Sequence, residues 1–238
     1  MFNNPSRALW LILPVIVLST GLVYWLVIRP WLLRWGATDT DVRRSLPGDD
    51  LLPHPKLETT HAVTIRASAA EVWPWLVQIG HKRAGWYSYD FLHRLMRVAG
   101  SVDDDRRSAK RIIPELQRLE VGDSVEIAPG MGFTVVAIEP GRALVLHVAL
   151  DMRTWRPFDP AGTMPDKYLN SSWVWFFEEV DERTTRLIVR TRYDYNPNLL
   201  NALMIHGVIG PGGSVMERKT LLGIQQPAEA AAGRHEEQ

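Results

Sequence analysis

The sequence predicts an α+β protein in which an antiparallel sheet is followed by a long C-terminal helix and preceded by one transmembrane helix. Three observations lead to this expectation. Residues Ala8–Ile28 carry no charged side chain. Between residues 121 and 195, strand-like segments follow one another with turn residues between them. Residues 198–225 then return to a largely helical pattern.

The N-terminal apolar stretch has the length of a membrane span. Its 21 residues, Ala8–Ile28, would reach across the roughly 30 Å hydrocarbon core of a bilayer at about 1.5 Å per residue. The run is longer than the core of a signal peptide, and no small-residue cleavage site follows it. Instead the chain continues as a basic, aromatic belt from Arg29 to Trp35. The sequence therefore predicts a permanent anchor in residues 1–35, with the bilayer as its first partner.

The distribution of arginines predicts the orientation of this anchor. Only the α-amino group and Arg7 precede the span, whereas Arg29, Arg34, Arg43 and Arg44 follow it closely. By the positive-inside rule we expect a single-pass protein of the cell membrane whose C-terminal domain lies in the cytoplasm. The absence of cysteine fits a reducing compartment, although it does not exclude an oxidising one.

The rest of the chain divides by composition. Residues 36–57 are rich in Pro, Gly and Asp and read as a linker or a strap laid over the domain. Residues 58–226 are long enough for one domain with a sizeable core, and residues 227–238 read as a disordered tail. Lys plus Arg equals Asp plus Glu at 27 each, so no net field favours nucleic acid as a partner.

The domain is expected to open with a strand and a capped helix. Residues 59–66 alternate as a half-buried strand, with His61 on the same face as the branched apolar residues that follow it. Ser68 and Glu71 have the spacing of a capping box, which opens a helix that stops at Gly80.

A helical insert is expected at about 81–120, with helical spacing over residues 89–96. The C-terminal helical segment is expected to be interrupted by glycines at 207–213. Between them, alternation and turn residues predict strands at 124–128, 133–139, 142–150, 171–180 and 185–195. Along residues 171–180, alternation places Trp173, Trp175 and Phe177 on one face and Val174 and Phe176 on the other.

Short motifs follow one another along the domain. They are VTI at 63–65, AAEVWPWLVQ at 69–78, GWYSYD at 85–90, VGD at 121–123, FTV at 133–135, EPGRALVL at 139–146, RTRY at 190–193 and MERK at 216–219. In this order they resemble the SRPBCC or START-like superfamily, also called the polyketide cyclase/dehydrase group, and most closely a membrane-anchored, actinobacterial-type subgroup. The resemblance implies a helix-grip fold, in which the sheet curves around the C-terminal helix and encloses an apolar cavity. In relatives that cavity holds lipids, sterols, polyketides or hormones, and the family has no universal catalytic set.

Aromatic rings with polar tips are the first candidates for lining such a cavity, because they supply contact area and an orienting hydrogen bond together. Each candidate also has a structural alternative. For Asp90 it is a helix cap, and for His147 it is a buried, hydrogen-bonded core residue. For the rings it is ordinary core packing. The candidate ligand-binding residues are Trp86, Tyr87, Tyr89, Asp90, His147, Trp173, Trp175 and Tyr193.

Three arginines alternate along the last predicted strand. Arg186, Arg190 and Arg192 share one face, opposite residues that include Thr191 and Tyr193. We expect the arginine face to be solvated, in a position to approach anionic headgroups.

The sequence offers no support for several enzyme classes. The histidines lack metal-ligand spacing and there is no cysteine, and neither a GxSxG motif, a phosphate loop nor a GxGxxG motif follows a strand. We therefore expect no metal and no cofactor. The favoured function is binding of a hydrophobic or amphipathic, lipid-like small molecule near the bilayer. The alternatives are a cyclase-type acid/base enzyme using His147, Asp90 or a tyrosine, and a non-catalytic accessory subunit with a membrane-protein partner.

Overall fold

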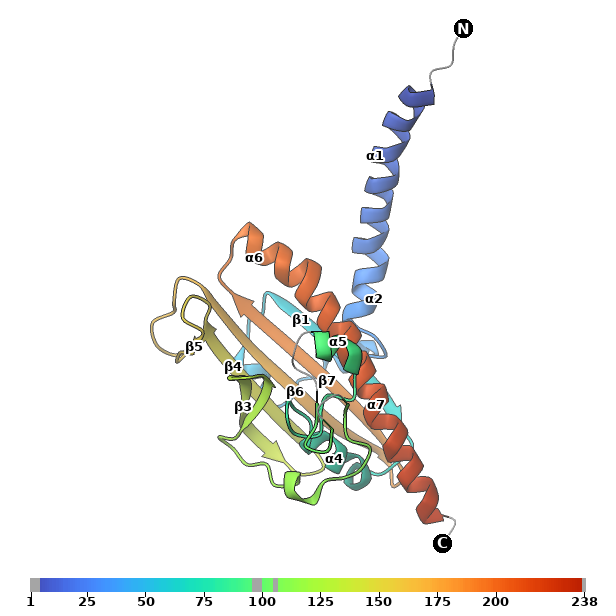
Figure 1. Cartoon of the computed structure of the whole chain (residues 1–238), viewed down its shortest axis with the longest axis vertical. Coiled ribbons are helices and arrows are strands. Elements are labelled where there is room, and N and C mark those ends of the chain that lie inside the picture. The colour runs from blue at the N-terminus through green and yellow to red at the C-terminus, as the bar shows by residue number, and fades with distance from the viewer. Residues whose placement is uncertain (1–4, 96–99, 105–106, 237–238) are drawn as a thin grey trace.

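A seven-stranded, wholly antiparallel sheet forms the centre of the protein (Figure 1). The computed structural model describes residues 5–95, 100–104 and 107–236. Six strands follow the order β1-β7-β6-β4-β3-β2, and the short β5 pairs with β4. The strands are β1 (Leu57–Ile65), β2 (Ser124–Ala128), β3 (Met131–Glu139), β4 (Ala143–Asp151), β5 (Arg156–Pro157), β6 (Tyr168–Asp181) and β7 (Thr184–Tyr195).

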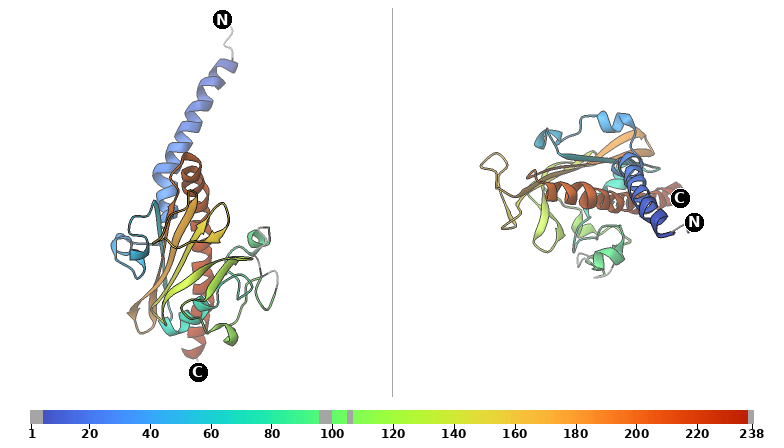
Figure 2. Two further views of the ribbon diagram at one scale, coloured as in Figure 1. Left: turned by 90° about the vertical axis from the view of Figure 1, so that its left-hand side faces the viewer. Right: turned by 90° about the horizontal axis from the view of Figure 1, so that it is seen from above.

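The inner face of the sheet packs against helix α7 (Gly210–Glu236) and the shorter helix α4 (Ala69–Val77) (Figure 2). Alternation along β6 sends Trp173, Trp175 and Phe177 to this inner core, as the sequence predicts. The expected fold class, a curved antiparallel sheet around a long C-terminal helix, is confirmed. The core also includes Val63, Ile65, Val72, Leu76, Leu187, Val189, Leu221 and Ile224.

Helix α4 begins where the capping box predicts. The Ser68 hydroxyl accepts a hydrogen bond from the Glu71 amide at 3.4 Å, and the Glu71 carboxylate accepts one from the Ser68 amide at 2.8 Å. Both partners satisfy amides that the helix itself leaves free. Gly80, with a φ of 133°, follows the helix.

The segment between the N-terminal helix and β1 lies as a strap across the outer face of the sheet (Figure 2). It contains the short helices α3 (Asp39–Arg43) and η2 (Asp49–Leu51). Leu46 of the strap packs against outer-face side chains of four strands, namely Ala62, Val145, Val174 and Ile188.

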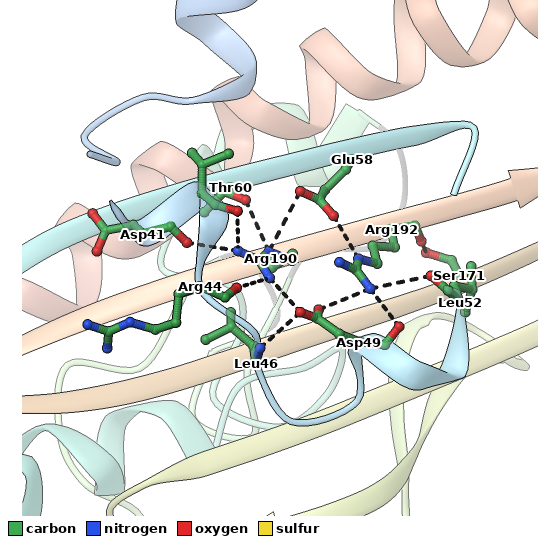
Figure 3. Close-up of polar contacts among 11 residues, drawn as sticks. Asp41, Arg44, Leu46, Asp49, Leu52, Glu58, Thr60, Ser171, Arg190 and Arg192 are labelled. Atoms are coloured by element: carbon green, nitrogen blue, oxygen red, sulfur yellow. Dashed lines mark hydrogen bonds and ion pairs between the residues drawn. The ribbon is translucent and has the colours of Figure 1, made fainter. Parts of the chain in front are cut away.

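The arginines of β7 hold this strap in place, so the expectation of a solvated arginine face was wrong. Arg190 is only 1% exposed. Its guanidinium donates to the Asp49 carboxylate at 2.6 Å, to the Thr60 hydroxyl at 3.2 Å and to three strap carbonyls (Figure 3). Arg192 donates to Glu58 at 2.7 Å. Alternation identified the shared face of these residues but not the segment that covers it.

Residues Pro5–Leu33 form one helical rod that projects away from the sheet (Figure 1). It consists of α1 (Pro5–Val23), the π-helical turn η1 (Tyr24–Ile28) and α2 (Arg29–Leu33). By length and composition two helices could cross a membrane: Leu13–Leu33, with a mean hydropathy of 1.7, and Leu199–Arg234, with 1.3. The second of these packs along the sheet over much of its length.

The C-terminal helix departs from expectation in two places. The expected interruption at 207–213 is absent, because α6 (Leu199–Met204) runs through a π-helical turn, η4 (Ile205–Ile209), directly into α7. The expected disordered tail, 227–238, is helical as far as Glu236, and residues 237–238 lie outside the described part. Alanine favours helix, and Ala228 is completely buried on the inner core.

The expected insert, 81–120, contains two short helices, α5 (Asp90–Leu95) and η3 (Pro114–Leu116). Residues 96–99 and 105–106 of the insert lie outside the described residues. The other insert residues run largely as loop beside the N-terminal half of α7, as Figure 2 shows.

Candidate functional site

A pocket of about 300 Å³ lies between the inner face of the sheet and the first turns of α7. We call it the inner pocket. Its volume is at the lower end of the roughly 300–1,000 Å³ that small-molecule sites occupy, and most of its wall is apolar or aromatic. It is lined by Thr59, Trp86, His93, Ile127, Ala128, Met131, Phe133, Trp173, Thr191, Tyr193, Gly210, Gly213, Ser214, Met216, Glu217 and Thr220.

Three rings form one continuous wall of the inner pocket. Trp86 from the insert stacks on Trp173 of β6, with ring centroids 6.0 Å apart and planes at 29°. Phe133 of β3 tilts against Trp173 at 5.6 Å. Because aromatic contacts between different elements fix each ring, this wall is held rigidly.

Close packing against α7 brings Trp86 to the pocket. A Cβ atom at Gly223 would lie 2.1 Å from the Tyr87 carbonyl oxygen, so only glycine permits this approach. Thr220 then donates to the Trp86 carbonyl at 2.9 Å, and Ser88 donates to the Met216 carbonyl at 3.0 Å. The segment is thus pinned to the helix on both sides of Tyr87.

Among the described residues of the inner pocket wall, Glu217 of α7 is the one carboxylate, and it is 9% exposed. The Trp173 indole donates to its Oε1 at 2.6 Å, and the Thr191 hydroxyl donates to the same oxygen at 3.3 Å. Its Oε2 is hydrogen-bonded to Nδ1 of His61. A carboxylate has about four lone-pair sites, so it retains capacity for a further donor from a ligand.

His61 lies behind Glu217, completely buried. Its Nε2 faces the Leu32 carbonyl, at the end of the N-terminal rod, at 2.8 Å. Since a carbonyl can only accept, Nε2 carries a proton, and a second proton must lie between Nδ1 and Glu217. Burial opposes the charged imidazole, but the charge and hydrogen bond of Glu217 and the Leu32 carbonyl outweigh it and raise the pKa of His61.

Two further titratable groups line the inner pocket. Burial, and secondarily the negative charge of Glu217, raise the pKa of the Tyr193 phenol, which therefore remains a potential donor at neutral pH. His93 of α5 is 3% exposed, and burial lowers its pKa against the opposing charge of Asp90. Its imidazole is neutral at physiological pH and can donate or accept.

Alternative sites in the described part of the chain are less developed. A larger hollow, about 720 Å³, lies between α4 and the β3–β4 turn, and the charged residues on its wall, Arg142 and Glu179, are exposed. No three His, Cys, Asp or Glu side chains among the residues the structure describes come together to hold a metal ion.

The structure brings three of the eight sequence candidates to the inner pocket: Trp86, Trp173 and Tyr193. Trp175 is fully buried beside Trp173 and does not line it. The other four lie elsewhere. Tyr87 points into the core, where its hydroxyl bonds to Gln78 and burial raises its pKa to about 12. Tyr89 packs on Phe91, Asp90 accepts from Ser108 at 3.0 Å, and His147 bonds to Asn170 at 2.7 Å.

Sequence analysis missed the residues that give the pocket its polarity, Glu217, His61 and His93. Two signals were present. His61 shares a strand face with Val63 and Ile65, which places an imidazole in the core. Glu217 is the first charged residue after an uncharged run from Asn196 to Met216. Neither signal predicts that Glu217 and His61 contact each other, because these two residues meet only through packing of α7 on β1.

No protein-family model matches this chain, and no curated protein matches it. Similar solved structures include a hypothetical protein from Helicobacter pylori (14% identity, 76% of this chain, 93% of that chain, TM-score 0.42). Another is a conserved protein from Geobacillus kaustophilus (12% identity, 74% of this chain, 97% of that chain, TM-score 0.39). A third is the di-domain ARO/CYC BexL from the BE-7585A biosynthetic pathway (16% identity, 73% of this chain, 46% of that chain, TM-score 0.39). This chain spans about half the length of that protein. At these low scores the function must be argued from the chain's own residues.

Proposed function

We propose that this protein binds an amphipathic, lipid-like small molecule in the inner pocket, beside the membrane in which its N-terminal rod is anchored. The single observation that carries the proposal is Glu217, a nearly buried carboxylate in a mostly apolar, aromatic wall. Few precisely placed polar groups in an apolar hollow are typical of ligand sites.

The site's charges suggest which ligand it would take. Glu217 and His61 share a proton and together carry no net charge, so the pocket does not require a charged ligand. Glu217 can accept from a hydroxyl, while Tyr193 can donate to an oxygen. A compact, mostly apolar molecule with one hydroxyl-bearing end therefore fits best.

Membrane anchoring belongs to the same proposal. The rod presents exposed apolar side chains such as Leu18, Leu22 and Leu26, as a lipid-facing helix does. The arginines that follow it favour a cytoplasmic domain. Holding the domain at the bilayer raises the local concentration of a lipid-like ligand, so modest affinity suffices.

Filling the pocket tests the proposal. In Gly213→Leu the new side chain enters the inner pocket, whereas in Gly212→Leu it gains the same side chain one position away, at an exposed residue outside the pocket wall. Mass spectrometry of solvent extracts from purified full-length protein should recover a bound amphiphile from wild type and Gly212→Leu, and little from Gly213→Leu. Equal recovery from all three variants, or none from wild type, would refute binding in this pocket.

An acid/base enzyme is the second candidate, and the shared proton of Glu217 and His61 favours it. Glu217 would exchange a proton with the bound molecule, and His61 would supply or accept its replacement. This assignment moves the chemistry away from His147 and Asp90, which lie outside the inner pocket. Incubating the recovered amphiphile with wild type and Glu217→Gln separates the candidates, because only an enzyme changes the molecule's mass or structure.

A further inference from the structure

The segment that precedes α7 exposes an unusual apolar surface. Leu199, Leu200 and Leu203 are 76%, 70% and 58% exposed. Met204 at the end of α6 and Val208 and Ile209 of η4 are exposed as well. We call Leu199–Ile209 the second apolar helix segment.

This surface lacks the charges that a solvated helix carries. No Asp, Glu, Lys or Arg occurs between Asn196 and Met216. The segment's other face is already occupied, because Ala202 and Ile205 pack with Tyr195. A helix that packs on one face and is apolar on the other needs a second apolar environment.

The base of the N-terminal rod meets the C-terminal part of this segment. Both Figure 1 and Figure 2 show α6 rising beyond the end of the sheet on the side from which the rod projects. Arg29 of the rod donates to Nδ1 of His206 at 2.7 Å and to its carbonyl at 3.3 Å. Leu33 packs with Ile205 in one cluster. The base of the rod and the second apolar helix segment are therefore fixed to each other.

We propose that the second apolar helix segment is embedded in the same phospholipid bilayer as the rod, with Leu200 and Leu203 in contact with lipid. The inference rests on the anchoring part of the proposed function. A rod that spans the bilayer brings lipid to the segment fixed beside its base, and hydrocarbon accepts an uncharged leucine surface without any need for a complementary protein face.

The second apolar helix segment adjoins the inner pocket. Gly210, Gly213 and Ser214 follow the segment immediately and form part of the pocket wall. A bilayer that reaches the second apolar helix segment therefore lies within about one helical turn of the pocket. A lipid-like ligand would enter from the membrane side without crossing bulk water.

Site-directed labelling can test this contact directly, because the chain has no cysteine. Single-cysteine variants at Leu200, Leu203, Leu18 and Val180 are labelled with an environment-sensitive fluorophore in the full chain. They are reconstituted into phosphatidylcholine vesicles with and without doxyl-labelled phosphatidylcholine. Leu18 lies in the rod and serves as the lipid control. Val180, 59% exposed at the β6–β7 turn, serves as the water control.

We expect doxyl lipid to quench labels at 200 and 203 several-fold more than at 180, and aqueous iodide to show the reverse order. Strong quenching at 18 with water-like behaviour at 200 and 203 would overturn the embedded segment and leave the anchor intact. Absence of lipid quenching at 18 would overturn the anchor itself. Labels at 200 and 203 that resist both quenchers would indicate cover by protein, which also contradicts the proposal. Circular dichroism of each variant confirms that the fold is retained.

Discussion

At the scale of single residues, His61 is the point where three parts of the molecule meet. It lies on β1, bonds to Glu217 of α7 through one nitrogen, and bonds to the Leu32 carbonyl of the rod through the other. Each bond fixes the position of the other, because the ring is planar and rigid. In the proposed complex, a ligand donor hydrogen-bonded to Glu217 would withdraw electron density from the carboxylate, so occupancy of the inner pocket would change how tightly His61 holds its proton.

Glu217→Gln should weaken ligand binding by about tenfold or more, because a hydrogen bond to a charged group contributes roughly 1.5–3 kcal/mol. Glutamine preserves shape and loses the charge. Glu229→Gln is the matched control, since Glu229 lies on the same helix and bonds to the Arg66 amide, outside the inner pocket. Titration of each purified variant with the amphiphile recovered from wild type measures the difference. Equal affinities for the two variants would show that Glu217 does not contact the ligand.

His61 should make stability depend on pH above neutrality. The folded protein holds its proton more tightly than the unfolded chain, whose histidine titrates at about 6.5. The contribution is therefore complete below about pH 6.5 and is lost as pH rises through the raised pKa, by at most about 1.4 kcal/mol per pH unit. Denaturant unfolding across this range should show the decline, and His61→Gln should flatten it. His93, whose pKa is lowered, acts only below about pH 6.5. A wild-type curve that rises with pH above 7 would contradict this assignment.

At the scale of elements, one buried guanidinium makes several of the hydrogen bonds that hold the strap. Arg190 has five N–H donors. The guanidinium donates to the Thr60 hydroxyl, the Asp49 carboxylate and the carbonyls of Asp41, Val42 and Arg44. Four of these five partners belong to the strap, so Arg190 joins residues 41–49 to the outer face of the sheet.

Arg190→Met should destabilise the protein by about 3–5 kcal/mol, because it leaves three strap carbonyls without their donor and removes a buried cation 2.6 Å from the Asp49 carboxylate. Asp49 keeps the Leu46 amide at 2.9 Å and Arg192 at 3.3 Å. Arg142→Met removes an exposed ion pair with Glu139 and should cost about 0–1 kcal/mol. Chemical unfolding gives the two values, and limited proteolysis should cut the strap only in the first variant. Similar stability of the two variants would mean that the strap is held by Leu46 packing and by the bonds of Arg186 and Arg192 instead.

Local periodicity accounts for what could be predicted of these elements. The expected strand at 124–128 coincides with β2, and the alternation of Trp173, Trp175 and Phe177 was correct, because a period of two depends only on neighbouring residues. What covers each face depends on distant segments. The arginine face looked solvated for that reason, although the strap buries it.

The candidate site was predicted less completely than the fold, for the same reason. Trp86, Trp173 and Tyr193 were selected as amphipathic rings and do line the inner pocket. His147 and Asp90 have equally suggestive local surroundings but lie outside it. Glu217 acquires its role from His61, which is 156 residues away in the sequence.

The prediction of a disordered tail was wrong for a related reason. Low complexity suggests disorder, but alanine also favours helix, and Ala228 packs on the inner core.

At the scale of the whole molecule, the rod is fused to the domain rather than tethered to it. Leu32 bonds to His61, Arg29 bonds to His206, and the Trp35 carbonyl accepts from the Ala62 amide at 3.2 Å. These contacts fix the direction of the rod relative to the sheet. With the rod spanning a bilayer as proposed, the domain would meet the membrane with the end at which α6 begins, and the β6–β7 turn would point away from it (Figure 1).

This geometry makes the orientation of the domain testable. The arginines that follow the span predict a cytoplasmic domain. In intact cells a membrane-impermeant maleimide should fail to label Val180→Cys and should label it after the membrane is permeabilised. A cysteine placed before the span, at Asn4, should show the opposite pattern. A rod that spans the bilayer would place the two labelling sites on opposite sides of it. Labelling of Val180→Cys in intact cells would place the inner pocket outside the cytoplasm and reverse the orientation proposed here.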